Sequence, residues 1–250
     1  MTRLGSLSLV DPGSLPNVWR GADLASEKCG LPTGHPVLDE ALPGGGWPQG
    51  SMVEVLQKSP GQHVWQLLLP GLATAIQRCA GPVVLVGSPY QPFGPSLKAQ
   101  GLASERLLCV QAEKSAARLW ATEQALRCPE VAAVMAWLPE ARSDELRRLH
   151  MAAQHQTQLL FVFRSWKSRH ETSPATLRLL VDGLDKLELH ILKRKGPPLS
   201  APLELPAHCP KLAALLQARK ARSQGASVTS PTKAVPGKSY VVLDRTRSIA

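Results

Sequence analysis

The chain has 250 residues, 44% of them hydrophobic, and a formal net charge of +10. This length and apolar content exclude a wholly disordered chain and suffice for one main domain with appendages. The longest apolar stretch, near residues 67–76, is too short to cross a bilayer and contains Pro70. Because the amino end also has no apolar leader stretch, we expect a cytoplasmic protein without a membrane partner.

The positive charge is concentrated toward the carboxyl end. Residues 207–250 hold eight Lys and Arg against Asp244 alone, which is +7 of the total +10. The five cysteines form no CxxC pair and several lie in apolar stretches, which favours buried free thiols in a reducing compartment. We expect an N-terminal arm over residues 1–32, a core over 33–206 and a largely disordered basic tail over 207–250.

In chain order, a short helix near residues 17–26 precedes a regular alternation of strands and helices. Strands are predicted at 52–56, 82–87, 106–111, 131–137, 159–163 and 186–193, and helices at 62–78, 94–100, 115–127, 143–155 and 174–181. Pro70 must kink or split its helix, and Ser115 and Ser143 are the expected N-caps of theirs. This alternation predicts an α/β fold with a largely parallel central sheet flanked by helices.

Residues 32–56, PTGHPVLDEALPGGGWPQGSMVEVL, contain the most informative motif. They resemble the stretch of the bacterial recombinase RecA that leads into its phosphate-binding loop. The matching residues are Thr33-Gly34, Leu38-Asp39, Gly44-Gly45-Gly46, Gly50 and Val53-Glu54-Val55. The resemblance extends to about residue 196 and implies a RecA-like core.

The loop that follows departs from the family pattern GxxxxGK[ST], in which the Lys neutralises phosphate charge and the hydroxyl holds Mg²⁺. From Gln57 the chain reads QKSPGQH, so that after Gly61 the Lys is replaced by Gln62 and the hydroxyl residue by His63. The family's catalytic acid, magnesium-linked Asp and sensor Gln correspond to Pro89, Ala136 and Ser165. The resemblance therefore implies a degenerate phosphate loop, reduced to a strand-to-helix turn, in a protein that is not an enzyme and has no cofactor or metal.

The two DNA-binding loops of the family are also reduced. The first would span only residues 138–142, and the second keeps Lys167, Arg169 and His170. Only weak, sequence-independent contact with DNA phosphates is expected. Its candidate residues are Lys167, Arg169, Lys233 and Lys238.

Among RecA-like proteins the chain is most similar to the ImuA family. The shared marks are Trp19-Arg20, the turn LPGGGWPQG at residues 42–50 and a loop without its Lys. The resemblance implies a non-catalytic accessory protein of error-prone translesion DNA synthesis in the bacterial SOS response to DNA damage. Its implied partners are RecA and ImuB, an inactive relative of Y-family polymerases, and no small-molecule substrate is implied.

A short helix near residues 211–222 is the candidate site for a partner. An apolar strip with basic residues beyond it suits a helix that docks in a groove, although the same strip could pack on its own domain. The candidate partner-binding residues are Leu212, Leu215, Leu216, Arg219, Lys220 and Arg222.

Four tryptophans bear on the core and the loop. Trp47 and Trp65 flank the loop and could fill the space that a nucleotide would need, whereas Trp120 and Trp137 are expected to be core residues.

Two other functional classes stay open. One is a cell-division inhibitor similar to SulA, whose relatives are shorter and would not need the basic tail. The other is a nucleotide-binding enzyme with an altered loop.

Overall fold

The computed structural model describes residues 30–183, 186–199, 201–206, 218, 219 and 222. The strands are β1 (Ser51–Gln57), β2 (Val83–Val86), β3 (Leu107–Val110), β4 (Ala133–Trp137), β5 (Leu159–Ser165), β6 (Leu177–Asp182), β7 (Leu187–Lys193) and β8 (Leu203–Leu205). The α-helices are α1 (Pro36–Ala41), α2 (Val64–Arg78), α3 (Gly94–Ala99), α4 (Ser115–Arg127) and α5 (Ser143–Gln154). The 3₁₀ turns are η3 (Ser104–Arg106) and η4 (Trp166–His170).

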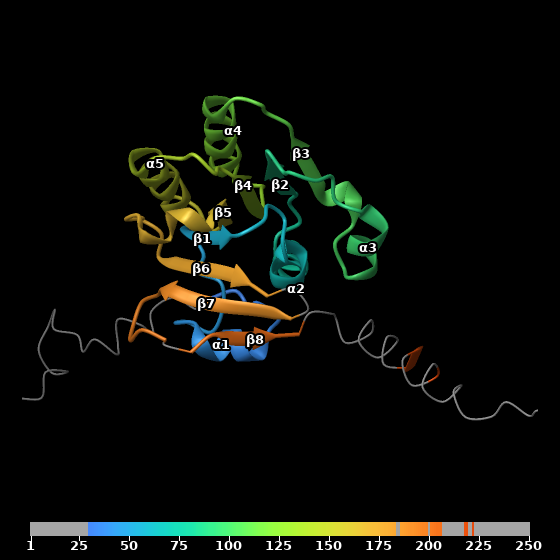
Figure 1. Ribbon diagram of the computed structural model, residues 1–250. Coiled ribbons are helices and arrows are strands. Elements are labelled where there is room, and N and C mark those ends of the chain that lie inside the picture. Colours follow the sequence, from blue (N-terminus) through green and yellow to red (C-terminus); the bar gives the residue numbers. More distant parts are fainter. Residues whose placement is uncertain (1–29, 184–185, 200, 207–217, 220–221, 223–250) are drawn as a thin grey trace, which may run out of the picture. The chain divides into compact units, whose positions relative to one another are not determined.

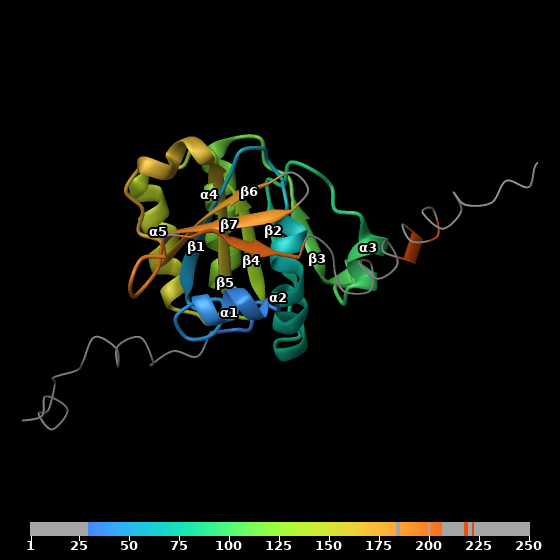
Figure 2. The ribbon, with the colours of Figure 1, turned by 60° about the horizontal axis from the view of Figure 1, so that its bottom comes forward.

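The described strands form one eight-stranded sheet in the order β3-β2-β4-β5-β1-β6-β7-β8 (Figure 1). Pairing is parallel from β3 to β6, and antiparallel between β6 and β7 and between β7 and β8. The predicted α/β class with a largely parallel sheet is therefore confirmed. Figure 2 looks toward the β7 and β8 edge, beside which α1 lies.

Two apolar clusters cover the two faces of the sheet. All seven residues of β1 are buried; Val53 and Val55 belong to the cluster under α2, and Met52 belongs to the cluster under α4 and α5. Both faces of a central parallel strand are buried, which explains why β1 reads as a nearly continuous apolar run.

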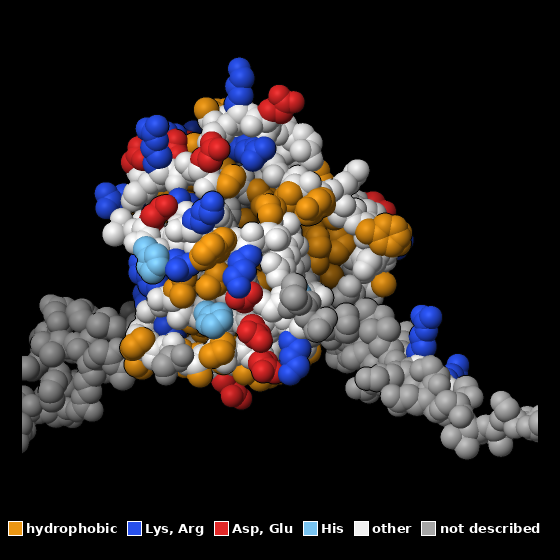
Figure 3. Space-filling model, viewed as in Figure 1, with side chains coloured by type: hydrophobic (Ala, Val, Ile, Leu, Met, Phe, Trp, Pro, Cys, Tyr) orange, Lys and Arg blue, Asp and Glu red, His pale blue; other side chains and the backbone are white. Residues whose placement is uncertain are grey.

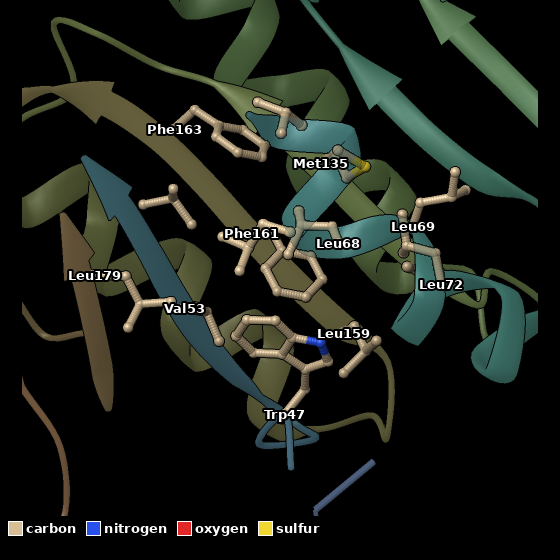
Figure 4. Packing of buried hydrophobic residues seen from close by; sticks show 14 of the residues in the cluster. Trp47, Val53, Leu68, Leu69, Leu72, Met135, Leu159, Phe161, Phe163 and Leu179 are labelled. Atoms are coloured by element: carbon tan, nitrogen blue, oxygen red, sulfur yellow. The ribbon is translucent and has the colours of Figure 1, made fainter. Parts of the chain in front are cut away.

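Trp47 does not flank the turn that follows β1, because it precedes the amino end of this strand. It is fully buried and packs edge-on against Phe161, with ring centroids 5.2 Å apart (Figure 4). A Cβ on Gly71 would lie 2.6 Å from the indole nitrogen of Trp47, so this close packing requires glycine in α2. Trp47 therefore fills the core, whereas Trp65, in the first turn of α2, is only partly buried.

Helix α2 contains Pro70 without being split. Proline has no N–H, so the carbonyl of Gln66, four residues earlier, loses its helical donor. The Nε2 of His35 donates to that carbonyl at 3.1 Å. A side chain from the segment before α1 therefore replaces the missing hydrogen bond, and the helix continues to Arg78.

Several local predictions were wrong. The helix predicted at residues 174–181 is the strand β6, in which Leu177, Leu179 and Val181 alternate with Arg178. Pro174 suggested the first turn of a helix. The segment instead pairs with β1, and this pairing outweighs the helical preference of its residues. Ser115 and Ser143 are the first helical residues rather than N-caps, and α1 and β8 were not predicted.

Strand β3 is an edge strand, and side chains on both of its faces are exposed. Leu108 and Cys109 are exposed, as are Cys79 and Cys128, so the prediction of buried thiols was wrong for these three cysteines. Apolar side chains gather over β3 and α3 in Figure 3.

The two predicted core tryptophans differ. Trp137 is buried and stacks on Phe163 at 4.4 Å, as expected. Trp120 is 65% exposed on α4, which contradicts the prediction. The helix faces the sheet with Thr122 and Leu126 instead, and Trp120 lies off that face.

None of the helices in the described part of the chain is long and apolar enough to cross a membrane.

Candidate functional site

The turn between β1 and α2 lies at the carboxyl end of a central parallel strand, where α/β proteins commonly bind ligands. Gly61 and His63 both have positive φ, of 81° and 53°. The positive φ favours glycine at position 61, where a Cβ would also lie 2.8 Å from the exposed ring of Tyr90. His63 is the only described non-glycine residue with positive φ, so other contacts must hold it in place.

The side chains of this turn bind the connection between β6 and β7. Nε2 of Gln62 donates to the carbonyl of Gly183 at 2.6 Å, and Nε2 of His63 donates to the same oxygen at 2.9 Å. Nε2 of Gln57 in turn donates to the carbonyl of Gln62 at 2.7 Å. Two donors use both lone pairs of the Gly183 carbonyl, so this contact is saturated.

Lys58 is also engaged. Its Nζ lies 2.5 Å from Oδ2 of Asp182, and the backbone N–H of Gly183 donates to Oδ1 of Asp182 at 2.8 Å. The hydrogen bond from Lys58, followed by that from Gly183, lowers the pKa of the Asp182 carboxyl. The side chains of this strand-to-helix turn are thus directed toward the protein's own backbone and carboxylate.

A buried ion cluster is centred on the same strand, β1. Glu54 of β1 is 0% exposed and accepts from Nη1 of Arg164 at 3.1 Å and from Nε of Arg178 at 2.7 Å. Nη2 of Arg164 also donates to Glu171 at 2.7 Å, which is the main reason that the pKa of Glu171 is lowered. Two carboxylates and two guanidinium groups leave the cluster electrically balanced.

This cluster holds the exposed turn η4. Arg178 donates to the carbonyls of Ser168 at 2.9 Å and of Glu171 at 3.0 Å. Lys167 and Arg169 project from this anchored turn, and the guanidinium of Arg169 lies 4.6 Å from the ring centre of Trp166. The structure therefore brings two of the predicted DNA-contact residues together on one hydrogen-bonded turn.

The predicted tail site lies mostly outside the described residues. Arg219 and Arg222 are helical and exposed. The other candidate residues outside the described part are Leu212, Leu215, Leu216, Lys220, Lys233 and Lys238. The arm helix predicted near residues 17–26 lies outside it as well.

Sequence reasoning missed the ion cluster and the role of Gly183. The available signal was charge inside apolar strands: Glu54 within MVEVL and Arg178 within LRLLV. A charged residue in a buried strand needs a partner of opposite charge, which the sequence alone does not locate. Gly183 acts through its carbonyl, which leaves no side-chain signal.

Comparison with known proteins gives one partial similarity. The chain is 28% identical over 107 residues to a cell division inhibitor SulA of Edwardsiella piscicida. The aligned part is 43% of this chain and 64% of that protein's length. No protein-family model matches the chain.

Proposed function

We propose that this chain is a non-catalytic protein with a RecA-like core and a degenerate phosphate loop, and that it acts by binding other proteins. The observation that carries the proposal is the shared carbonyl of Gly183, to which both Gln62 and His63 donate. These two residues replace the Lys and hydroxyl residue that nucleotide chemistry would require.

Opening the turn for a phosphate group would be unfavourable. It would break the two hydrogen bonds to Gly183 and compete with the pair between Lys58 and Asp182. No ammonium group would replace them at position 62, so the phosphate charge would stay poorly compensated. A core whose loop does not bind nucleotide can still act by binding other proteins through its surfaces.

The role that we favour is that of a cytoplasmic accessory protein of error-prone translesion synthesis in the bacterial DNA-damage response. The support is the ImuA-like pattern at residues 42–63, together with the basic tail. In this role the core docks to RecA, and the tail docks to an ImuB-like partner.

Two measurements test this proposal. Calorimetric titration with Mg-ATP to about 1 mM should give no binding heat, and ATP turnover above background that is lost when the loop is mutated would contradict it. A pull-down from DNA-damaged cells should recover RecA and the ImuB-like protein. Without residues 207–250 the ImuB-like protein should be lost while RecA stays; failure to recover either partner would argue against the role.

A second candidate is a cell-division inhibitor. The similarity to a SulA protein over 107 residues favours it. Overexpression should then block septation and give filamentous cells, while deletion leaves damage-induced mutagenesis unchanged. The translesion role predicts normal septation on overexpression and less damage-induced mutagenesis on deletion. The same set of strains therefore separates the two candidates.

A further inference from the structure

Helices α4 and α5 border a groove of about 470 Å³ on the face of the molecule away from α2. Its walls carry Glu123 and Arg127 from α4 and Arg147 and Arg148 from α5. Charged side chains of both signs gather over these two helices in Figure 3. The groove is remote from the turn after β1 and was not singled out by any sequence motif.

The groove has an excess of positive charge. Glu123 accepts from Arg127 and from Arg148, each at 2.6 Å, so one carboxylate is shared by two guanidinium groups. Arg147 is exposed and forms no ion pair with any residue in the described ranges. Three arginines against one glutamate leave a wall that attracts carboxylates, with two of the arginines already held in place.

The groove also has an apolar side. Leu126 lies fully buried at its base, and Met151 is 55% exposed within it. An unbranched, polarisable Met side chain adapts to irregular apolar partners and is common on surfaces that receive helices. A partner segment with an apolar residue flanked by carboxylates would suit this surface. The apolar residue would cover Met151, and the carboxylates would pair with the arginines.

We propose that this groove binds an acidic amphipathic helix of a partner protein. Such a helix would place an apolar residue on Met151 and carboxylates against Arg147 and Arg148, which is the usual helix-in-groove arrangement. The chain's own tail is a poor occupant because residues 207–250 carry +7. Nucleic acid fits less well, because Glu123 and Met151 interrupt the basic surface. The proposal does not depend on the role in DNA damage.

The test uses the full-length chain and a fluorescein-labelled helical peptide of about 18 residues, with Leu at helical spacing and Glu on both sides. Fluorescence anisotropy should show saturable binding with Kd in the micromolar range. Arg147→Glu should weaken binding by about threefold or more, without breaking any described ion pair. Met151→Asp should weaken it by about tenfold, because the apolar anchor is lost.

Lys98→Glu is the matched control, since Lys98 is exposed on α3 outside the groove, and it should leave Kd unchanged. A permuted peptide of the same composition, with no apolar face, should bind at least about tenfold more weakly. Absence of saturable binding would overturn the proposal, as would equal binding of the permuted peptide. Loss of affinity in the Lys98 variant equal to that in the Arg147 variant would also overturn it. Displacement of the peptide by an equally charged oligonucleotide at equal concentration would assign the groove to polyanions instead.

Discussion

Three residues explain how α2 tolerates an internal proline. Pro70 leaves the carbonyl of Gln66 without its helical donor, and His35 supplies one. His35→Ala should lower the free energy of unfolding by about 1–3 kcal/mol, because a part-buried carbonyl is left without a partner. Pro70→Ala restores a backbone N–H, so the same His35 change made in that background should cost clearly less.

Urea denaturation of the four proteins in this double-mutant cycle measures the coupling. Two additive effects would mean that His35 stabilises the chain through packing alone, independently of Pro70.

Two histidines make stability depend on pH. Burial lowers the pKa of His35, and burial followed by repulsion from Lys193 lowers that of His150, whose Nδ1 accepts from the backbone N–H of Met52. The unfolded chain therefore binds more protons just below pH 6.5, the ordinary value for histidine. The free energy of unfolding should fall as pH drops through 6.5 toward the lowered values, and should be insensitive to these groups above that range.

Urea midpoints measured at about pH 7.5 and about pH 5.5 test this dependence. His150→Gln should reduce the difference between the two midpoints. His155→Gln, a change at the exposed C-cap of the same helix, should leave the difference as it is. A midpoint that rises on acidification would contradict the assignment.

At the scale of elements, the ion cluster couples β1, β5 and β6 to the turn η4. Glu54→Gln removes the only fully buried carboxylate of this cluster and leaves Arg164 and Arg178 facing an amide. We expect the free energy of unfolding to fall by about 3 kcal/mol, since removal of one member of a buried ion pair leaves an uncompensated charge.

Hydrogen exchange should also accelerate at the amide of Glu171, which binds the carbonyl of Ser168 within the anchored turn. Glu204→Gln is the matched control, because its pair with Lys186 is exposed; it should change stability by less than about 0.5 kcal/mol. Equal losses in the two variants would mean that burial of Glu54 contributes nothing beyond a surface pair.

The sequence predicted most of the strands because buried parallel strands are apolar on both faces. The runs around Met52, Val84, Val134 and Phe161 are of this kind, and the structure confirms strands at each. Strand β6 was mistaken for a helix because Pro174 is a common first helical residue and Leu180 interrupts the alternation. Short elements such as α1 and β8 carry too few residues to establish a period.

The candidate site was only partly accessible from sequence. The unusual residues Gln62 and His63 could be identified because a family pattern marks what is missing there. Their actual partner could not, because Gly183 is about 120 residues away and contributes a backbone oxygen. The groove between α4 and α5 was missed because its arginines resemble ordinary solvent-facing charges on each helix taken alone.

On the scale of the whole molecule, charge is divided unequally between the core and residues 207–250, which hold +7 of the +10. We expect the chain ending at Ala207 to fold, and any DNA binding to disappear. With the tail present, affinity for single-stranded oligonucleotide should fall by orders of magnitude between about 50 and 200 mM salt if about six or more phosphates are contacted.

Fluorescence anisotropy on the full-length and shortened proteins measures both effects, and ATP should change neither. Tight binding that survives both high salt and removal of the tail would instead point to Lys167 and Arg169 on the anchored turn η4.

The unequal burial of the tryptophans has an optical consequence. Trp47 and Trp137 are enclosed in the core, whereas Trp120 faces solvent. Emission from the enclosed indoles should lie at shorter wavelength and resist iodide, while the emission of Trp120 should be red-shifted and quenchable. The intrinsic fluorescence of this protein is therefore a composite signal, to which enclosed and solvent-facing indoles contribute at different wavelengths.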